Sequence, residues 1–223
     1  MQDVSFSKMK RIECKNRKAW EKERSKGIGG SDAAAVVGQN KYMTNIELWR
    51  IKTGKEEAEN ISKKQCVIYG HKAEKPMIEL FKLDYPEFEV IRNPYTVLVN
   101  DEYEWLRGTL DAELLHRESR TYGIFEAKTT TCYNSEQFMR WNGQIPNNYY
   151  VQLLHYFLID KRFKFAILKA LINFVDNYKM KASSTRPVSY THLRAHETRR
   201  HGVCRLLLEK KKGGGGGGGG GGG

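Results

Sequence analysis

Two short apolar segments carry charged residues at a spacing that constrains the fold of this chain more than any other feature. Asp111 lies in the segment 106–115, and Glu126, Ala127 and Lys128 end the segment 122–128. If both segments are strands, alternation places Glu126 and Lys128 on the same face. Glu126 could then join Asp111 in an oxygen-rich site for a hard divalent cation such as Mg²⁺, with Lys128 beside the bound water. The pattern therefore predicts a strand pair equipped for metal-assisted phosphodiester hydrolysis.

The residues around the Glu-x-Lys pair bear on how specific the pattern is. Acidic and basic residues also alternate on the solvated faces of ordinary antiparallel strands, which is the alternative interpretation. Here Gly123-Ile124-Phe125 precedes Glu126 and three threonines follow Lys128, so the strand is apolar and β-branched. Gly108 stands shortly before Asp111, and a glycine in a strand often marks a close backbone approach. These flanks favour a functional site over a solvated face.

Two helical segments supply further polar side chains. Glu74 opens a segment with helical spacing of apolar residues. Gln152 and Tyr156 lie four residues apart in a second such segment, so they share one helix face. A glutamine and a tyrosine on one face can hold a water or a phosphate oxygen by hydrogen bonds.

Over about residues 15–178, the order of these motifs resembles a known family. The motifs are Trp20-x3-Arg24, Ile28-Gly29-Gly30-Ser31-Asp32, Gly70-x3-Glu74, Asp111, Glu126-Ala127-Lys128 and Gln152-x3-Tyr156. The chain is similar to the YqaJ-type viral recombinases, relatives of phage lambda exonuclease within the PD-(D/E)xK nuclease superfamily. It departs from the superfamily pattern in one place, because Leu110 stands where the proline of the motif name would be.

The resemblance implies a role for each of these residues. Asp111 and Glu126 would bind Mg²⁺ or Mn²⁺ together with the backbone carbonyl of Ala127, and Glu74 would reach the same ion directly or through water. Lys128 would orient or help to deprotonate the attacking water. The remaining assignments are that Gln152 holds the catalytic strand or the nucleophile, that Tyr156 supports Gln152, and that Arg24 and Ser31 grip a 5′-terminal phosphate.

The resemblance also implies an activity and partners. We expect a metal-dependent 5′-to-3′ exonuclease that acts at double-stranded DNA ends and leaves 3′ single-stranded overhangs, as in phage-type homologous recombination. The implied partner is a phage single-strand annealing protein, and related exonucleases form a homotrimer. Two alternatives remain: a structure-selective or sequence-specific endonuclease with the same core, or a DNA-binding module without catalysis.

The pattern of elements predicts an α/β fold with a PD-(D/E)xK restriction-endonuclease-like core, in which helices flank a central mixed sheet. Ser31 or Asp32 can cap a short helix that begins near Ala33, where free amides would favour a phosphate. We expect helices over 8–26, 33–37, 45–52, 70–83, 134–142 and 149–159, and strands over 88–91, 95–99, 106–115, 122–130 and 165–174.

Residues 187–223 do not read as part of a fold. The segment 187–198 resembles a translated sequencing adapter, the segment 203–212 resembles the adapter end running into poly-A, and 213–223 is a run of eleven glycines. His192, His196 and His201 could otherwise suggest a metal cluster, and the basic residues a nucleic-acid arm. We expect residues 1–186 to form one C-terminally truncated nuclease domain and residues 187–223 to be a disordered artefact.

Composition limits the class of protein. The tail carries +5 of the formal net charge of +12, so residues 1–186 keep +7, which suits a polyanionic partner. Cys14, Cys66 and Cys132 lie far apart, so we expect neither a disulfide framework nor an iron–sulfur cluster. No signal peptide or membrane-spanning stretch is apparent, and the cytoplasm of a bacterium or an infected host cell is the expected compartment.

Aromatic and amide residues gather after the second predicted catalytic strand. Trp141, Asn142 and the segment 146–150 could stack on unpaired bases near a basic cleft. Packing against the edge of the sheet is the alternative.

Overall fold

The computed structural model describes residues 9–141, 144–175, 186–188 and 192–194 of the chain, which form a two-sheet α/β fold. The helices are α1 (Arg17–Arg24), α2 (Gly30–Val36), α3 (Asn45–Lys52), α4 (Gln65–Asp84), α5 (Ser135–Met139) and α6 (Asn147–Ile159). The strands are β1 (Met9–Glu13), β2 (Phe88–Ile91), β3 (Thr96–Asn100), β4 (Arg107–Gly108), β5 (Ala112–His116), β6 (Tyr122–Cys132), β7 (Phe163–Phe174), β8 (Arg186–Val188) and β9 (His192–Arg194).

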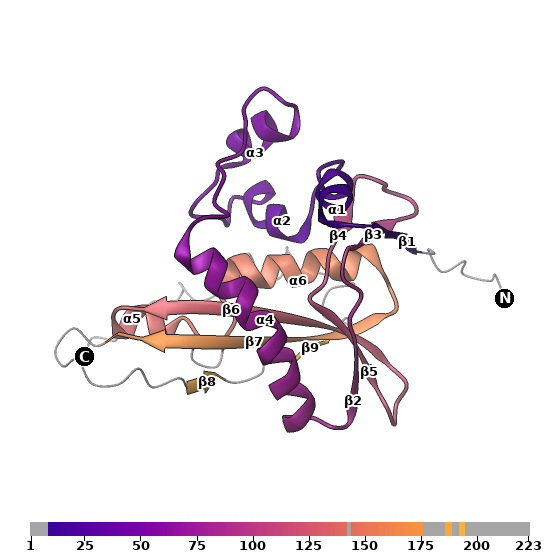
Figure 1. Cartoon of the computed structure of the whole chain (residues 1–223), viewed down its shortest axis with the longest axis vertical. Helices are drawn as coiled ribbons and strands as arrows, with labels where there is room; N and C mark the ends of the chain where they lie inside the picture. Colours follow the sequence, from indigo (N-terminus) through magenta and orange to yellow (C-terminus); the bar gives the residue numbers. More distant parts are fainter. Residues whose placement is uncertain (1–8, 142–143, 176–185, 189–191, 195–223) are drawn as a thin grey trace, which may run out of the picture.

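The larger sheet is mixed and has the order β2-β5-β6-β7-β8, with β9 also paired to β7. β5 runs antiparallel to β6, and β6 runs parallel to β7 along its whole length. A parallel pair needs a crossover connection, and α5 with α6 provides it. Figure 1 shows α6 lying along the long strands β6 and β7. The expected central mixed sheet with flanking helices is confirmed.

Alternation along β6 sends side chains into two separate cores. Ile124 packs with Leu153 and Phe157 of α6 on one face of the sheet. Phe125 packs with Ile78 and Phe81 of α4 on the other. Because successive strand residues point to opposite faces, Glu126 and Lys128 continue the face that α6 covers. The sheet is thus held between α6 and α4, and the Glu-x-Lys pair lies on the α6 side.

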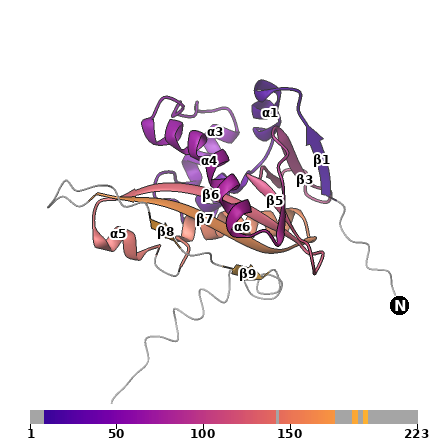
Figure 2. The same cartoon turned by 60° about the horizontal axis from the view of Figure 1, so that its bottom comes forward.

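The smaller sheet has the order β1-β3-β4, so the N-terminal strand β1 lies at its edge. Figure 2 shows β1, β3 and α1 lying together to one side of β6 and β7. A parallel bridge between Ile28 and Leu106 ties the α1–α2 connection to the chain just before β4. Asn100 also joins this sheet to α6, because its side-chain amide donates to the carbonyls of Leu158 and Ile159 at 3.1 and 3.2 Å.

Three local expectations were wrong. Residues 8–26 were expected to be one helix, but residues 9–13 pair with β3 as a strand and the helix begins only at Arg17. The expected strand 106–115 is divided into β4 and β5, which belong to different sheets, and Asp111 lies in the bend between them. The cap of α2 is Gly29 rather than Ser31 or Asp32, and Asp32 instead accepts a hydrogen bond from the Gly29 amide at 2.9 Å.

Most other elements agree with the expectations. α3 has the predicted bounds, whereas α4 begins five residues before the predicted start at Gly70. Trp141 is buried against the core of the α6 face, which favours packing over stacking for this residue, and Asn142 lies outside the described residues. Among the described residues, the structure contains no helix of the length and apolarity that a membrane crossing requires.

The predicted artefact segment is described only in two short pieces. Pro187 and Val188, at the end of β8, and the whole of β9 lie antiparallel to β7, so disorder was the wrong expectation for these residues. The rest of 187–223, including His196 and His201, lies outside the described residues. The origin of the segment and the domain boundary near residue 186 stay predictions.

Candidate active site

Asp111 is brought to β6 by the bend that separates β4 from β5. Its Oδ2 accepts a hydrogen bond from the backbone amide of Ala127 at 2.8 Å. The β5–β6 ladder ends with the pair Ala112 and Phe125, so Ala127 lies beyond the last pair. Asp111 therefore takes the place of the missing strand partner, and this bond fixes it next to Glu126.

Glu126 is almost fully buried, at 3% exposed, and its two oxygens differ. Oε1 accepts from Lys128 Nζ and from Gln152 Nε2, each at 2.6 Å. Oε2 is buried without a hydrogen-bond partner among the described residues. A buried carboxylate oxygen without a partner costs free energy, so it marks a position where a cation or a donor belongs.

Lys128 joins β6 to α6. Its ammonium group forms the ion pair with Glu126 and lies 5.1 Å from the ring centroid of Tyr149. The side chain as a whole is 21% exposed. The predicted sharing of one strand face by Glu126 and Lys128 is confirmed by their contact.

One face of α6 supports this pair. Gln152 donates from Nε2 to Glu126 and also to the Tyr156 hydroxyl at 2.9 Å. Tyr156 in turn donates to the backbone carbonyl of Thr109 at 3.0 Å. The predicted partnership of Gln152 and Tyr156 is therefore present, and it links the acidic strand to the segment that leads into Asp111.

Burial and neighbouring charges shift the pKa values of Asp111, Lys128 and Tyr156. Burial raises the pKa of the Asp111 carboxyl well above its usual range, and the negative charge of Glu126 adds to this effect. Burial opposes the charge of Lys128, but the attraction of Glu126 and Asp111 outweighs it and raises the pKa of the ammonium group. Burial, followed by the charge of Glu126, also raises the pKa of Tyr156 well above its usual range, so Tyr156 remains a hydrogen-bond donor.

Glu74 lies close to the site but is already engaged. It projects from α4, where its Oε1 accepts from Arg92 at 2.6 Å. Its charge adds to burial and to the charge of Glu126 in raising the pKa of Asp111. Glu74 is thus near enough to influence the site, while Arg92 holds one of its oxygens.

The donor set fits a hard divalent cation. Within the described residues, no group of three or more His, Cys, Asp or Glu side chains is arranged to hold a metal ion. The backbone can complete the set, because the amide and carbonyl of one strand residue point to the same side, so the Ala127 carbonyl lies on the side of Asp111. Together with the orphan oxygen of Glu126, these groups offer the oxygen ligands that Mg²⁺ and Mn²⁺ favour.

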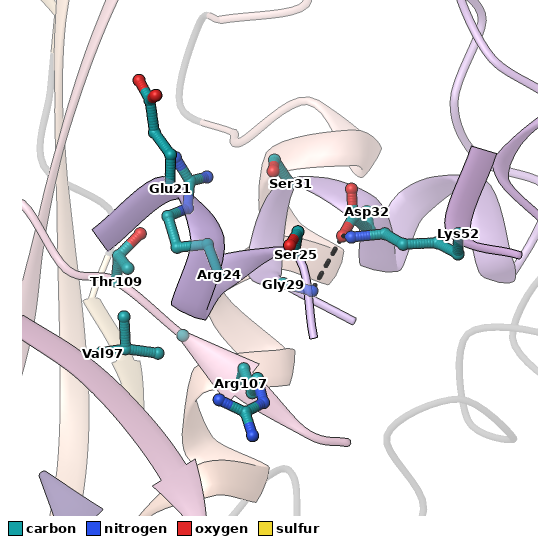
Figure 3. A pocket seen from close by; sticks show the side chains of 11 residues that line it. Glu21, Arg24, Ser25, Gly29, Ser31, Asp32, Lys52, Val97, Arg107 and Thr109 are labelled. Atoms are coloured by element: carbon teal, nitrogen blue, oxygen red, sulfur yellow. Dashed lines mark hydrogen bonds and ion pairs between the residues drawn. The ribbon is translucent and has the colours of Figure 1, made fainter. Parts of the chain in front are cut away.

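The second group of predicted residues, Arg24 and Ser31, lines a separate pocket of about 200 Å³. Figure 3 shows these two side chains coming from successive helices, with Asp32 beside Lys52. Gly108 and Thr109 form part of the same wall. The pocket is connected to the acidic centre by a chain of hydrogen bonds, from the Thr109 carbonyl through Tyr156 and Gln152 to Glu126.

The ion pairs of the pocket leave one cation available. Lys52 pairs with Asp32 at 2.6 Å, and Arg107 pairs with Glu23 at 2.6 Å. Arg24 instead lies over the ring of Trp20 at 4.4 Å and has no carboxylate partner among the described residues. Arg24 can therefore compensate an anion that enters the pocket.

The sequence did not indicate several residues that shape these sites. Lys52, Arg107 and Thr109 line the pocket. Tyr149 was expected only as part of the segment 146–150 that could stack on bases, and in the structure its ring lies by Lys128. The helical spacing of Tyr149, Gln152 and Tyr156 could have placed it on their face, since positions three and four residues apart share a face. No local signal marks Lys52 or Arg107, because their positions depend on contacts between distant segments.

Comparisons with known proteins agree with this architecture. The model of the YqaJ-like viral recombinase domain matches residues 19–161, which include every predicted site residue. The uncharacterized protein YqaJ of Bacillus subtilis (strain 168) is 32% identical over 141 residues, covering 63% of this chain and 41% of that protein. The chain thus spans less than half the length of this relative.

A solved structure shows the same fold. The crystal structure of LHK-Exo in complex with dAMP superposes with a TM-score of 0.51 and 14% sequence identity, covering 88% of this chain and 94% of the other. At this level of identity the likeness concerns the fold.

Proposed function

Because the chain belongs to the YqaJ-like viral recombinase family, we propose that it is a metal-dependent deoxyribonuclease that degrades one strand of duplex DNA from its 5′ end. The product would be DNA with 3′ single-stranded overhangs. The observation that carries the proposal is the buried Glu126, which is held by Lys128 and Gln152 on one oxygen and has no partner on the other in the described part of the chain. The exonuclease fold of LHK-Exo supports it.

Mg²⁺ or Mn²⁺ is the cofactor of the proposal. The ion would be held by Asp111, the free oxygen of Glu126 and the Ala127 carbonyl, with Glu74 nearby or acting through water. When bound, such an ion lowers the pKa of a water molecule and neutralises charge on the phosphate. The raised pKa of Asp111 reflects burial beside a second carboxylate, and a dication is the natural counter-charge for that pair.

The side chains of the protein position the reaction. Lys128 keeps its proton, because nearby carboxylates raise its pKa, so it supplies fixed positive charge where the phosphate becomes more negative. Gln152 orients Glu126 by a direct hydrogen bond, and Tyr156 holds Gln152. Each of these groups is set before substrate arrives, which is what electrostatic catalysis requires.

The pocket of Arg24 and Ser31 accounts for the choice of DNA end. A terminal phosphate carries more negative charge than an internal one, and Arg24, which has no carboxylate partner within the described residues, can meet it. Thr109, which lines this pocket, precedes Asp111 by two residues in the chain. A 5′-phosphate in the pocket would therefore place a neighbouring phosphodiester at the acidic centre.

The proposed exonuclease function also implies binding partners. Double-stranded DNA ends are the proposed substrate, a phage single-strand annealing protein would take up the 3′ overhang, and a homotrimer would explain processive digestion. The net charge of +7 on residues 1–186 suits a DNA substrate.

A cleavage assay tests the proposal. Linear duplex DNA with 5′-phosphate ends, the same duplex with 5′-hydroxyl ends, and closed circular DNA are each incubated with the protein and Mg²⁺. We expect release of nucleotides from the phosphorylated linear duplex and an intact circle. Cleavage of the circle would identify an endonuclease, and binding without any cleavage would identify a non-catalytic DNA-binding module.

A further inference from the structure

An ion pair between Glu74 and Arg92 stands at the edge of the candidate active site. Arg92 Nη2 donates to Glu74 Oε1 at 2.6 Å, and Arg92 has no second hydrogen-bond partner among the described residues. Glu74 belongs to α4, whereas Arg92 directly follows β2. The pair therefore joins the helix that carries one predicted metal ligand to the sheet that carries Glu126.

The packing of α4 on β6 fixes where Glu74 lies along the strand. A Cβ at Gly70 would lie 3.3 Å from Thr129 Oγ1, so this part of the helix is close to Thr129. Farther along the helix, the ring of Phe81 packs on the ring of Phe125, with their centroids 4.8 Å apart. α4 thus runs against the direction of β6 as it crosses the sheet (Figure 1). Glu74, one turn after Gly70 and on the same side of the helix, lies between these two contacts.

The part of β6 between the two contacts carries the acidic centre. Ala127 lies midway between them, and its side chain packs on the α4 side of the sheet. Its backbone amide binds Asp111 at 2.8 Å, so the Asp111 carboxylate is at the same level of the strand. Glu74 therefore approaches the centre from the face of the sheet opposite to that of Glu126.

The register of the sheet brings Arg92 to the same place. Ile91 pairs with Glu113 in the β2–β5 ladder, so Arg92 lies at the end of the sheet where β5 begins, close in the chain to Asp111. Val90 packs against the core under α4, and alternation puts Arg92 on that face as well. Arg92 is thus placed by the sheet, independently of α4, at the point where it meets Glu74.

We propose that Arg92 is a positioning residue that holds Glu74 in the orientation in which it serves the metal site of Asp111 and Glu126. Arg92 binds Oε1 of Glu74, and Oε2 accepts no hydrogen bond within the described residues, so that oxygen is available to the site. A glutamate side chain that is fixed in advance loses less conformational entropy when it becomes a ligand. This inference rests on the proposed function for the nature of the site as a metal centre.

The charge of Arg92 gives the prediction a definite sign. A guanidinium repels a nearby dication and competes with it for Glu74, so loss of that charge alone would strengthen metal binding. Loss of the orientation of Glu74 would weaken it. Weaker metal binding after removal of Arg92 therefore distinguishes positioning from a general effect of charge.

The test measures metal binding separately from cleavage. Mn²⁺ is titrated calorimetrically into the full chain after treatment with a chelator, in the absence of DNA. The variants are Arg92→Ala, Arg92→Lys, Glu74→Ala and the double variant of Arg92→Ala with Glu74→Ala. Lys75→Ala is the matched control, because Lys75 is an exposed cation next to Glu74 in the chain. The Arg92 side chain is 41% exposed and its ion pair is partly solvated, so its removal should not affect folding.

We expect Arg92→Ala to bind Mn²⁺ about 10- to 100-fold more weakly, the usual effect of losing a residue that holds a metal ligand. Arg92→Lys should stay closer to the wild type, because Glu74 receives only one charged donor from Arg92. On the Glu74→Ala background, Arg92→Ala should cause no further loss, since it acts through Glu74. Lys75→Ala should not weaken binding. Equal or tighter binding by Arg92→Ala, or the same loss with and without Glu74, would overturn the proposal.

Cleavage of 5′-phosphorylated linear duplex at increasing Mg²⁺ separates this inference from the proposed function. Arg92→Ala should need more Mg²⁺ for half of its maximal rate and should approach the wild-type kcat at saturation. A wild type that cleaves, with an Arg92→Ala variant that binds metal normally, overturns the role of Arg92 and leaves the nuclease function standing. A wild type that binds Mn²⁺ but never cleaves, with the expected loss in Arg92→Ala, supports the positioning role and removes the nuclease function. A wild type that binds no Mn²⁺ overturns both.

Discussion

Gln152 of α6 donates its side-chain amide to Glu126 of β6 at 2.6 Å. The two residues are 26 positions apart in the chain, and both are buried. Because Lys128 binds the same oxygen of Glu126, the second oxygen is left without a partner among the described residues. The helix and the strand thus present a carboxylate that is oriented on one side and available on the other.

Removal of the charge of Glu126 should abolish the stabilisation that Mg²⁺ gives. A ligand that binds only the folded state raises the free energy of unfolding by about 2.7 kcal/mol at one hundred times its Kd. We expect Mg²⁺ to raise the Tm of the wild type and to leave the Tm of Glu126→Gln unchanged, as measured by thermal unfolding with and without chelator. Glu136→Gln is the control, since Glu136 is exposed on α5 and should leave the effect of Mg²⁺ intact. An equal rise in Tm for Glu126→Gln would rule out Glu126 as a ligand.

Lys128→Ala should separate binding from cleavage. Loss of one fixed positive charge at the reacting phosphate commonly lowers the rate by about a hundredfold or more. We expect at least this loss in single-turnover cleavage, with the fold preserved and duplex DNA still bound. Lys161→Ala, which removes the same charge from an exposed turn, is the control. Full nuclease activity in Lys128→Ala would refute the role of Lys128.

Arg24→Ala should remove the preference for phosphorylated ends. Arg24 is the cation of its pocket without a carboxylate partner in the described part of the chain, so its loss leaves a terminal phosphate uncompensated. We expect the ratio of kcat/KM for 5′-phosphate over 5′-hydroxyl duplex to fall by about tenfold or more, as for one charge-assisted hydrogen bond. Lys22→Ala, on the same helix but outside the pocket, should keep the wild-type ratio. The pocket assignment fails if both variants discriminate equally well.

Gly30→Ala should disturb Tyr156 and, through it, the active site. A Cβ at Gly30 would lie 2.5 Å from the Tyr156 ring, which is too close for any side chain. Overpacking of this kind costs about 1–3 kcal/mol, so we expect a lower free energy of unfolding in urea and weaker cleavage. Gly29→Ser is the control, because a Cβ there has only an ordinary contact at 3.5 Å with Asp32 and serine is a favourable cap. Equal stability of the two variants would contradict this packing.

His155 should make stability depend on pH. Burial lowers the pKa of its imidazole, although the hydrogen bond to the Arg107 carbonyl at 2.8 Å opposes the shift. The unfolded chain therefore binds a proton more readily than the folded protein, so stability is complete above the unfolded pKa and is lost as pH falls through the folded pKa. For one group the slope is at most about 1.4 kcal/mol per pH unit.

The measurement is urea unfolding at about pH 7.5 and about pH 5.5, on either side of the usual histidine pKa. We expect the wild type to lose more stability between these two values than His155→Gln does. The exposed His71 provides the control, and His71→Gln should follow the wild type. If His155→Gln lost as much as the wild type, another group would carry the titration.

Local features of the sequence predicted much of the fold correctly. α3 has the predicted bounds because Thr44 and Glu47 form a capping box, which is a signal within four consecutive residues. The alternation of Glu126 and Lys128 also needs only the strand period, and their contact agrees with it. Residues 9–13 were missed because their strand depends on pairing with residues 96–100, far along the chain. A single strand over 106–115 was the wrong expectation, because its two halves pair with different sheets. The apolar pattern alone does not reveal this division.

The sequence by itself predicted which residues would carry the chemistry, and it determined the face that Glu126 shares with Lys128, because strand and helix periods are properties of neighbouring residues. The tertiary structure decided that Asp111 binds the Ala127 amide and that Gln152 reaches Glu126. It also decided that Arg107 and Lys52 are paired with carboxylates, whereas Arg24 has no such partner among the described residues. These contacts join segments that are distant in sequence, so they depend on how the sheet and α6 pack together rather than on any local pattern.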